Sequence, residues 1–302
     1  MSLIVTGSIS IDTIDTPTGS VKEVVGGSSI YFTAAASFFG PIRLVGAVGD
    51  DFPDAYVDVF HGFKVDVGGL ERRKGSKTFR WHGRYHEDVN QRDTVSVELN
   101  VLTEALPPIP KNFTDSKYIF LAVTHPDNQL KLLDAFPQRK LVVADTIDLY
   151  INTTRDQLLE VFKRIDGLII NDSEAQMLTG EPNAVVAADK LIAMGPKFVV
   201  VKKGQHGAIL KHPDGICVLP AYPAKTVIDP TGAGDSFAGA FMAYLAHTDD
   251  TSFDSLKTAM AYGTTVASFT IESFSVERLQ QITRADIDKR FKEFTDMLRI
   301  DA

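Results

Sequence analysis

The alternation of short apolar runs with amphipathic stretches is the feature that most constrains the fold of this chain. The runs that we interpret as buried strands are residues 3–5, 43–48, 118–123, 141–144, 168–170 and 198–201. Helix-like stretches lie between them, among them residues 28–39, 154–164 and 183–194. Because crossover helices join parallel strands, this order predicts an α/β fold with a largely parallel sheet covered on both faces.

Composition narrows the range of partners. The chain has 302 residues, and its 31 basic and 39 acidic residues leave a formal net charge of −8, which disfavours nucleic acid and anionic membranes. Its single cysteine, Cys217, cannot form an intramolecular disulfide, and no cysteine and histidine cluster has zinc spacing. The amino terminus does not resemble a signal peptide, and no apolar run approaches the ~18 residues of a bilayer span. We therefore predict a cytoplasmic protein without nucleic-acid or membrane partners.

A β-ribbon interrupts the alternation. Residues 77–85 and 94–99 alternate apolar or aromatic with polar side chains, and the polar segment 86–93 joins them, which predicts two paired strands. On pattern alone the ribbon is an ordinary edge hairpin. Its rings favour a second interpretation, a lid over a ligand or a contact between two copies of the chain. These ring-bearing residues are Phe79, Trp81, His82, Tyr85 and His86.

A glycine-rich segment, Asp-Pro-Thr-Gly-Ala-Gly-Asp at residues 229–235, carries the clearest chemical signal. Phe237, Phe241 and Tyr244 follow it at helical spacing, so the helix begins at the glycines. The first turn of a helix offers unpaired N–H groups and the positive end of the macrodipole, and glycines let an anion approach them. A carboxylate there repels a phosphoryl group unless it removes a proton from the acceptor, so Asp235 is a candidate general base. The alternative is a glycine-rich turn in which Asp235 only matches the helix dipole.

Other polar residues stand at the carboxyl ends of predicted strands, where α/β proteins bind ligands. Asp12 follows the first strand and is either a turn residue or an acceptor of hydrogen bonds from a polyol. Asn171 and Glu174 end one strand and open a helix, which is a common position for helix capping. Lys202 ends another strand beside a glycine turn and is either a solvated terminus or a counter-charge for phosphate.

The segment at residues 229–241 resembles the carboxy-terminal signature of the ribokinase or PfkB-type carbohydrate kinases. Other stretches fall in that family's chain order, so the resemblance covers nearly the whole chain. These stretches are residues 7–12, similar to the first strand with its substrate-binding aspartate; Gly26-Gly27 and residues 45–51, similar to the amino-terminal signature; residues 171–174, the Asn-x-x-Glu motif; and residues 202–207, the nucleotide-side strand and turn.

The resemblance implies a three-layer α/β/α ribokinase-like domain with a mainly parallel central sheet and a small β-sheet lid. We expect residues 1–302 to form this single domain, with the lid built from about residues 12–25 and 74–100. The implied reaction moves the γ-phosphoryl group of ATP to a hydroxyl of a small sugar-like acceptor. The implied cofactors are ATP and Mg²⁺, with K⁺ as a further candidate.

The same resemblance assigns roles to the matched residues. Asp235 is the general base, and the backbone amides of Gly232, Ala233 and Gly234 stabilise the transferring group. The residues expected to bind the acceptor are Asp12, Gly26, Gly27, Tyr31 and Trp81. The residues expected on the nucleotide side are Asn171, Glu174, Lys202, Gly204 and Gly207, of which Asn171 and Glu174 hold hydrated Mg²⁺. Asp229 and Thr231 are expected to help hold a monovalent cation.

One departure from the family pattern bears on the acceptor. Many members carry an asparagine shortly after the Gly-Gly pair, whereas this chain has Ser28-Ser29-Ile30-Tyr31 there. An aromatic residue at this point resembles branches that act on cyclitols or nucleosides, so a nucleoside competes with a simple sugar. A non-catalytic ligand-binding regulator is the alternative of a different class, although a sensor does not need the base Asp235. The exposed ribbon also predicts a homodimer through the lid.

Overall fold

The computed structural model describes residues 2–300, which contain a nine-stranded main sheet in the order β13-β12-β11-β10-β9-β8-β1-β4-β5. Its strands are β1 (Leu3–Thr6), β4 (Ile42–Gly49), β5 (Val65–Arg73), β8 (Tyr118–Leu121), β9 (Leu141–Ala144), β10 (Gly167–Asn171), β11 (Phe198–Lys202), β12 (Ala208–His212) and β13 (Gly215–Leu219). The seven strands from β5 to β11 in this order pair in parallel, and β12 alone runs opposite to the other strands. The prediction of a largely parallel sheet is confirmed.

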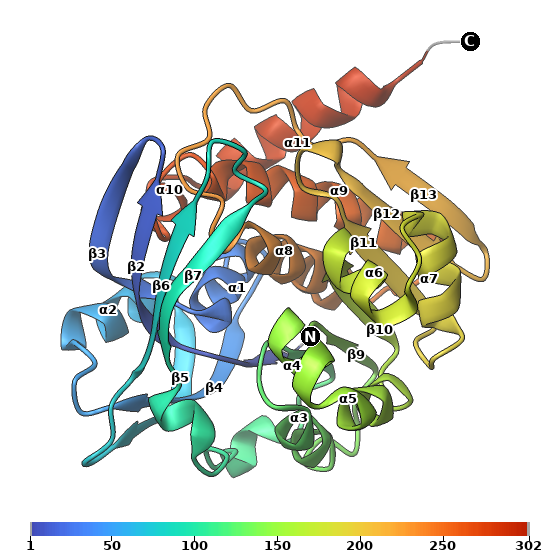
Figure 1. Cartoon of the computed structure of the whole chain (residues 1–302). Helices are drawn as coiled ribbons and strands as arrows, with labels where there is room; N and C mark the ends of the chain where they lie inside the picture. Colours follow the sequence, from blue (N-terminus) through green and yellow to red (C-terminus); the bar gives the residue numbers. More distant parts are fainter. Residues whose placement is uncertain (1, 301–302) are drawn as a thin grey trace.

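Helices cover both faces of this sheet, as expected for an α/β/α arrangement (Figure 1). One face carries α1 (Ser28–Ala36), α2 (Asp54–Gly62), α8 (Ala233–Thr248), α9 (Phe253–Thr270), α10 (Glu277–Gln280) and α11 (Arg284–Leu298). The other carries α3 (Pro126–Leu133), α4 (Asp148–Thr153), α5 (Arg155–Phe162), α6 (Asp172–Thr179) and α7 (Ala184–Ile192). Because side chains alternate along a strand, Leu3 and Val5 of β1 pack against the first set, and Ile4 packs against the second.

A second sheet of four strands has the order β3-β2-β6-β7. It consists of β2 (Ser10–Thr16), β3 (Gly19–Gly26), β6 (Phe79–Tyr85) and β7 (Arg92–Glu98). Two antiparallel hairpins, β2 with β3 and β6 with β7, join through the parallel pair β2 and β6. Figure 1 shows these blue and teal strands side by side at the upper left. The predicted β-ribbon is therefore present as β6 and β7.

The position predicted for Asp12, directly after a strand of the main sheet, is wrong. Asp12 lies inside β2 of the second sheet, because the chain leaves β1 at Thr6 and enters a new strand at Ser10. The apolar residues Ile9, Ile11 and Ile14 are buried and continue the strand pattern beyond the point where a turn was expected. The acceptor-binding candidate is thus carried by the second sheet.

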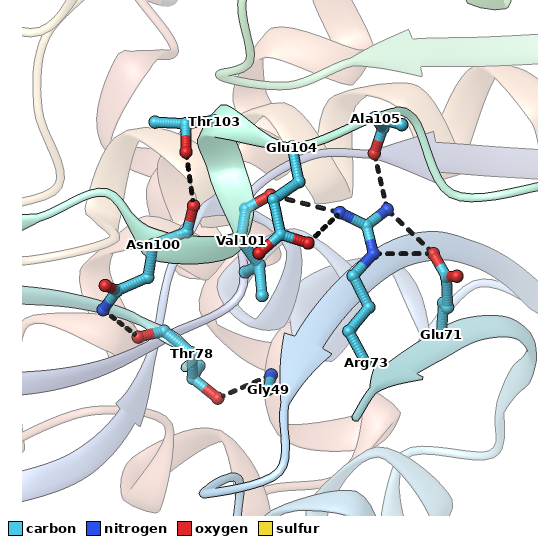
Figure 2. A network of polar contacts seen from close by, with 9 residues as sticks. All are labelled: Gly49, Glu71, Arg73, Thr78, Asn100, Val101, Thr103, Glu104 and Ala105. Atoms are coloured by element: carbon cyan, nitrogen blue, oxygen red, sulfur yellow. Dashed lines mark hydrogen bonds and ion pairs between the residues drawn. The ribbon is translucent and has the colours of Figure 1, made fainter. Parts of the chain in front are cut away.

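A network of polar contacts fastens the second sheet to the main sheet (Figure 2). We call it the root network: Glu71, Arg73, Thr78, Asn100, Glu104 and the backbone groups that they contact. The Arg73 guanidinium donates to Glu71 at 2.8 and 2.9 Å and to Glu104 at 3.3 Å. It also donates to the backbone carbonyls of Val101 and Ala105, in the segment that follows β7. Asn100 donates to the carbonyl of Thr78 at 2.9 Å, and the Thr78 hydroxyl accepts from the backbone of β4 at 3.0 Å. The starting point of β6 and the end of β7 are thereby fixed on β4 and β5.

Candidate active site

The first turn of α8 has the geometry predicted for an anion cradle. Gly232 is the N-cap residue with φ 73°, a left-handed conformation that favours glycine, and no side chain caps the helix. A Cβ on Gly232 would collide with the ring of Tyr31, so only glycine fits here. Of the three amides predicted to form the cradle, that of Ala233 already donates to the carbonyl of Pro230 at 3.2 Å. The N–H groups of Gly234 and of the following Asp235 lie in the first turn, where a helix offers no carbonyl partner. These donors and the helix dipole suit a negatively charged group.

Lys202 brings a positive charge to this cradle. It ends β11, and a Cβ built on Gly234 would lie 2.5 Å from its Nζ, so the ammonium group rests against the first turn of α8. Within the described residues, no carboxylate oxygen lies within 4.0 Å of Nζ. Burial raises the pKa of Asp235, and the charge of Lys202 opposes that rise. Lys202 is therefore placed to meet an anion while it favours the ionised form of Asp235.

Asp145 was not selected from the sequence, yet the structure places it in the same site. It follows β9 directly, and its Oδ1 is buried without a hydrogen-bond partner. Burial raises its pKa well above the usual range, the charge of Asp235 raises it further, and Lys202 opposes the rise. The signal that could have found Asp145 is the rule that selected Asn171, a polar residue at the carboxyl end of a buried strand.

Asn171 and Glu174 form a capping box at the start of α6. The Oδ1 atom of Asn171 accepts from the backbone N–H of Glu174 at 2.8 Å, and Oε2 of Glu174 accepts from the backbone N–H of Asn171 at 2.8 Å. The prediction that Asn171 and Glu174 cap a helix is therefore confirmed. Glu174 is buried, which raises its pKa, and Lys202 opposes the rise. One oxygen of Glu174 remains outside the cap, so the capping role does not exclude a ligand.

Asp12 is the carboxylate expected to bind the acceptor. It is 3% exposed, its carboxylate occupies the space where a Cβ of Gly26 would be, and its Oδ1 has no hydrogen-bond partner. Burial first, and then the charges of Asp229 and Asp235, raise its pKa to about 7. Gly27 follows with φ 90° as the N-cap of α1. Hydrogen bonds from Ser10 and from the backbone of Gly27 oppose the rise in the pKa of Asp12. The one buried oxygen of Asp12 that lacks a partner is suited to accept a hydrogen bond from a hydroxyl group.

The aromatic candidates differ in what they present to a ligand. Tyr31 is 1% exposed and packs its ring against Gly232, while its hydroxyl is buried without a partner. Trp81 is partly exposed and pairs in register with Asp12, so the two side chains share one face of the second sheet. Its indole donates to Thr94 at 3.3 Å. Trp81 therefore offers ring surface beside Asp12, whereas Tyr31 offers mainly its hydroxyl.

Asp229 and Thr231 precede the cradle and connect it to the second sheet. The Oδ1 atom of Asp229 accepts from the backbone N–H of Thr231 at 2.9 Å, and its Oδ2 is buried without a partner. Burial raises the pKa of Asp229 to about 6. The Thr231 hydroxyl donates to the hydroxyl of Tyr85 on β6 at 3.0 Å. Sequence analysis did not single out this contact between the second sheet and the cradle.

Gly204 and Gly207 bound the turn between β11 and β12. The backbone N–H of Lys203 donates to the carbonyl of Gly207 at 2.7 Å, which closes the turn. A Cβ on Gly204 would collide with Oδ1 of Asn90, so the loop between β6 and β7 touches this turn. The second sheet thus reaches from the acceptor candidates to the candidate nucleotide side.

The structure gathers five carboxylate residues from distant parts of the chain into what we call the acidic cluster: Asp12, Asp145, Glu174, Asp229 and Asp235. Their charges act on one another, and Lys202 and Arg92 supply opposing positive charge. Three of the five hold a buried oxygen without a partner. Such a site favours ligands that donate hydrogen bonds or carry cations.

A hollow lies near the carboxyl ends of β1, β4 and β8. Its volume is about 470 Å³, which includes the solvent at its opening. Its walls include Gly7, Ala47, Leu102, Thr124 and His125. None of the residues of the acidic cluster or of the cradle is among the residues that line this hollow. Among residues 2–300, no three histidine, cysteine, aspartate or glutamate side chains converge as a ready-made metal cluster.

Comparisons with known proteins agree with the geometry. A family model described as pfkB family carbohydrate kinase matches residues 2–282. A cytidine kinase of Thermococcus kodakarensis is 32% identical over 250 residues, which cover 80% of this chain and 88% of that protein. The solved structure of a nucleoside kinase from Methanocaldococcus jannaschii has a TM-score of 0.77 at 20% identity, covering 97% of this chain and 98% of that one. Ribokinase from Thermotoga maritima has a TM-score of 0.75 at 21% identity, covering 97% and 99%.

In the described part of the chain, none of the helices has the length and apolar character needed to cross a bilayer. The cytoplasmic location stays a prediction.

Proposed function

Because the chain belongs to the pfkB family of carbohydrate kinases, we propose that it transfers a phosphoryl group from ATP to a hydroxyl of a nucleoside. The observation that carries this choice of acceptor is the 32% identity to a cytidine kinase over 80% of the chain. One feature of the site supports it. Trp81 lies in register with Asp12, so an aromatic ring and a carboxylate share one face of the second sheet.

The chain's own residues divide the work between binding and proton transfer. Asp12 accepts a hydrogen bond from an acceptor hydroxyl, and Trp81 lines the same face of the second sheet. Asp235 takes the proton of the reacting hydroxyl. The N–H groups at the start of α8 and the ammonium group of Lys202 stabilise the charge of the transferring group. The second sheet closes over the acceptor and excludes water.

Family membership implies ATP and Mg²⁺ as partners of the reaction. The donor set fits a hydrated magnesium ion, because the capping box leaves one oxygen of Glu174 free and Asp145 holds an unpartnered oxygen close by. Asn171, Glu174 and Asp145 would hold the ion through carboxylate and amide oxygens and water. When bound, Mg²⁺ neutralises the triphosphate, which the acidic cluster would otherwise repel.

A magnesium titration of Glu174→Gln separates capping from ion binding. Glutamine keeps the capping box, since its amide oxygen also accepts from the N–H of Asn171. We expect unchanged thermal stability and a higher magnesium concentration for half-maximal rate. Coincident magnesium curves for Glu174→Gln and the wild type would leave only the structural role.

A potassium site beside Asp229 is proposed from one buried oxygen. The buried Oδ2 of Asp229 has no partner, and the segment holding it leads directly into the cradle. A monovalent cation there would balance this charge and fix the entry to α8. Initial rates in potassium and tetramethylammonium buffers of equal ionic strength test it, and equal rates would contradict it.

The acceptor itself is tested by ADP release with a panel of pyrimidine and purine nucleosides, ribose and cyclitols. We expect kcat/KM to be highest for a nucleoside. We also expect Trp81→Ala to lower kcat/KM selectively for nucleosides, because stacking of a base on an aromatic ring contributes ~1–3 kcal/mol. A sugar preferred over every nucleoside, with Trp81→Ala affecting both alike, would support a ribokinase-like acceptor instead.

Homodimer formation through the second sheet is proposed because β7 is an edge strand exposed along its whole length. Sedimentation velocity tests this pairing. A monomer at every concentration would contradict it.

A further inference from the structure

Arg92 opens β7 and carries a positive charge without a carboxylate partner. In the part of the chain that the structure describes, no acidic oxygen lies within 4.0 Å of its guanidinium, whereas Arg80 and Arg84 on the neighbouring strand each pair with aspartate. The Arg92 guanidinium instead lies over the ring of Trp81, 5.5 Å from the centroid. It also lies within hydrogen-bonding reach of the Tyr85 hydroxyl. Because neither contact neutralises its charge, the guanidinium is available to an anion.

Strand register places Arg92 on the face of the second sheet that looks toward the cradle. Arg92 pairs directly with Tyr85, so the two side chains point to the same side. The hydroxyl of Tyr85 accepts a hydrogen bond from Thr231, the residue before Gly232. Two residues before Arg92, Asn90 contacts Gly204 in the turn on the nucleotide side. The segment that carries Arg92 is therefore held between the cradle and that turn.

The charge of Arg92 acts on the site itself. Burial raises the pKa values of Asp235 and Glu174, Lys202 opposes the rise in both, and Arg92 adds to that opposition. Lys202 belongs to the main sheet and Arg92 belongs to the second sheet. The cradle thus has one positive group, Lys202, on the main sheet and a second, Arg92, on the second sheet.

We infer that Arg92 binds the phosphate groups of the nucleotide from the second sheet, and that this contact couples nucleotide binding to closure of that sheet. The planar guanidinium can donate two parallel hydrogen bonds to phosphate oxygens, which an ammonium group cannot do. The inference rests on the proposed kinase function. In the nucleotide-free chain Arg92 stays on Trp81, and with nucleotide it leaves the ring for the phosphates.

Trp81 is the single tryptophan of the chain, so its fluorescence reports on Arg92. The experiment compares Arg92→Gln with Arg84→Gln, a matched control that removes a half-exposed arginine pairing with Asp15 at 3.6 Å on the neighbouring strand. Each protein is titrated with ADP and with ATP and magnesium while tryptophan emission is recorded. We expect a nucleotide-dependent emission change in the wild type and in Arg84→Gln, and its loss in Arg92→Gln.

Steady-state kinetics complete the test. For Arg92→Gln we expect KM for ATP to rise about tenfold and kcat to fall about 10²-fold, with the Kd of the acceptor within about threefold of wild type. Arg92→Lys should recover part of the KM effect and little of kcat, because it restores charge but not the planar fork. Arg84→Gln should match the wild type.

An emission change in Arg92→Gln equal to that of the wild type would overturn the inference, and so would unaltered ATP kinetics. An equal loss of acceptor and ATP affinity would also overturn it, since it would indicate a misfolded second sheet. A wild-type protein that binds nucleotide but phosphorylates no acceptor would contradict the proposed function, and the ADP titration would still decide the role of Arg92.

Discussion

The root network and the acidic cluster are both polar and partly buried, yet they differ in whether their buried polar atoms have hydrogen-bond or ion-pair partners. Arg73 is 10% exposed and donates to two glutamates and two carbonyls, so its charge is fully paired. In the acidic cluster, Asp12, Asp145 and Asp229 each keep a buried oxygen without a partner. Paired buried charges hold a structure together, whereas unpaired ones destabilise it until a ligand completes them. The residues of the root network therefore fix the second sheet, whereas those of the acidic cluster are suited to bind a ligand.

Asp235→Asn should produce the largest effect and should act on chemistry alone. A neutral amide cannot take the hydroxyl proton, so we expect kcat to fall by ~10²–10⁴. The free energy of unfolding should stay equal or rise, because a buried carboxylate with a raised pKa is removed. Rapid-quench kinetics and urea unfolding measure the two quantities. Near wild-type turnover would exclude Asp235 as the base.

Arg73→Met should show the reverse pattern. It leaves Glu71 and Glu104 without their partner, so we expect the free energy of unfolding to fall by about 2–4 kcal/mol. At saturating substrate, kcat should change far less than in Asp235→Asn. Arg84→Met, which removes a side chain that is 58% exposed, is the control and should cost no more than about 1 kcal/mol. Equal losses of unfolding free energy in the two variants would mean that the contacts of Arg73 stabilise the fold no more than an exposed ion pair does.

The pH dependence of stability tests the acidic cluster directly. The pKa of Asp12 is about 7 in the folded chain and near 3.8 in the unfolded one, so between these values the folded state binds the extra proton. The free energy of unfolding should therefore fall as pH rises from about 4 to about 7. In Asp12→Asn this fall should be smaller by about 1–3 kcal/mol, while Asp229 keeps part of it. Parallel stability profiles for the two proteins would contradict the raised pKa of Asp12.

Tyr85→Phe should give the smallest effect, since it removes only the hydroxyl through which the second sheet contacts Thr231 before the cradle, and Arg92 on β7. We expect a loss of about 0.5–1.5 kcal/mol, seen as a rise of less than about tenfold in KM for ATP with kcat retained. Thermal stability should stay close to that of the wild type. A large loss of stability instead would place Tyr85 with the root network.

Much of the site could be predicted from short motifs, because local sequence sets local geometry. The glycines before α8 predict the cradle, and the residues after β10 predict the capping box. Asp145 could have been predicted in the same way, because it directly follows a buried apolar strand. The place of Arg92 in the site could not be predicted, since it depends on the pairing of β6 with β7 and on a register shift between His82 and Gly83.

The fold was predicted where strands are apolar or alternate regularly, and missed where glycines and charged residues interrupt the pattern. The six predicted strands became β1, β4, β8, β9, β10 and β11, all largely buried. β5 was missed because glycines and charged residues obscure its pattern, although it pairs with β4 over most of its length. Asp12 was misplaced because β2 begins only a few residues after β1 ends. Such errors arise where long-range pairing, not local sequence, decides the structure.

The second sheet joins two segments of chain that residues 27–78 separate, because β3 ends at Gly26 and β6 begins at Phe79. Each hairpin can form early from neighbouring residues, but the parallel pairing of β2 with β6 requires a long loop to close. That loop contains α1, β4, α2 and β5, which pack on the main sheet. Refolding should therefore be biphasic, with the main sheet gaining protection from hydrogen exchange before the β2 and β6 amides do. A newly made chain would pass through a stage in which α8 and its cradle are formed but not yet covered.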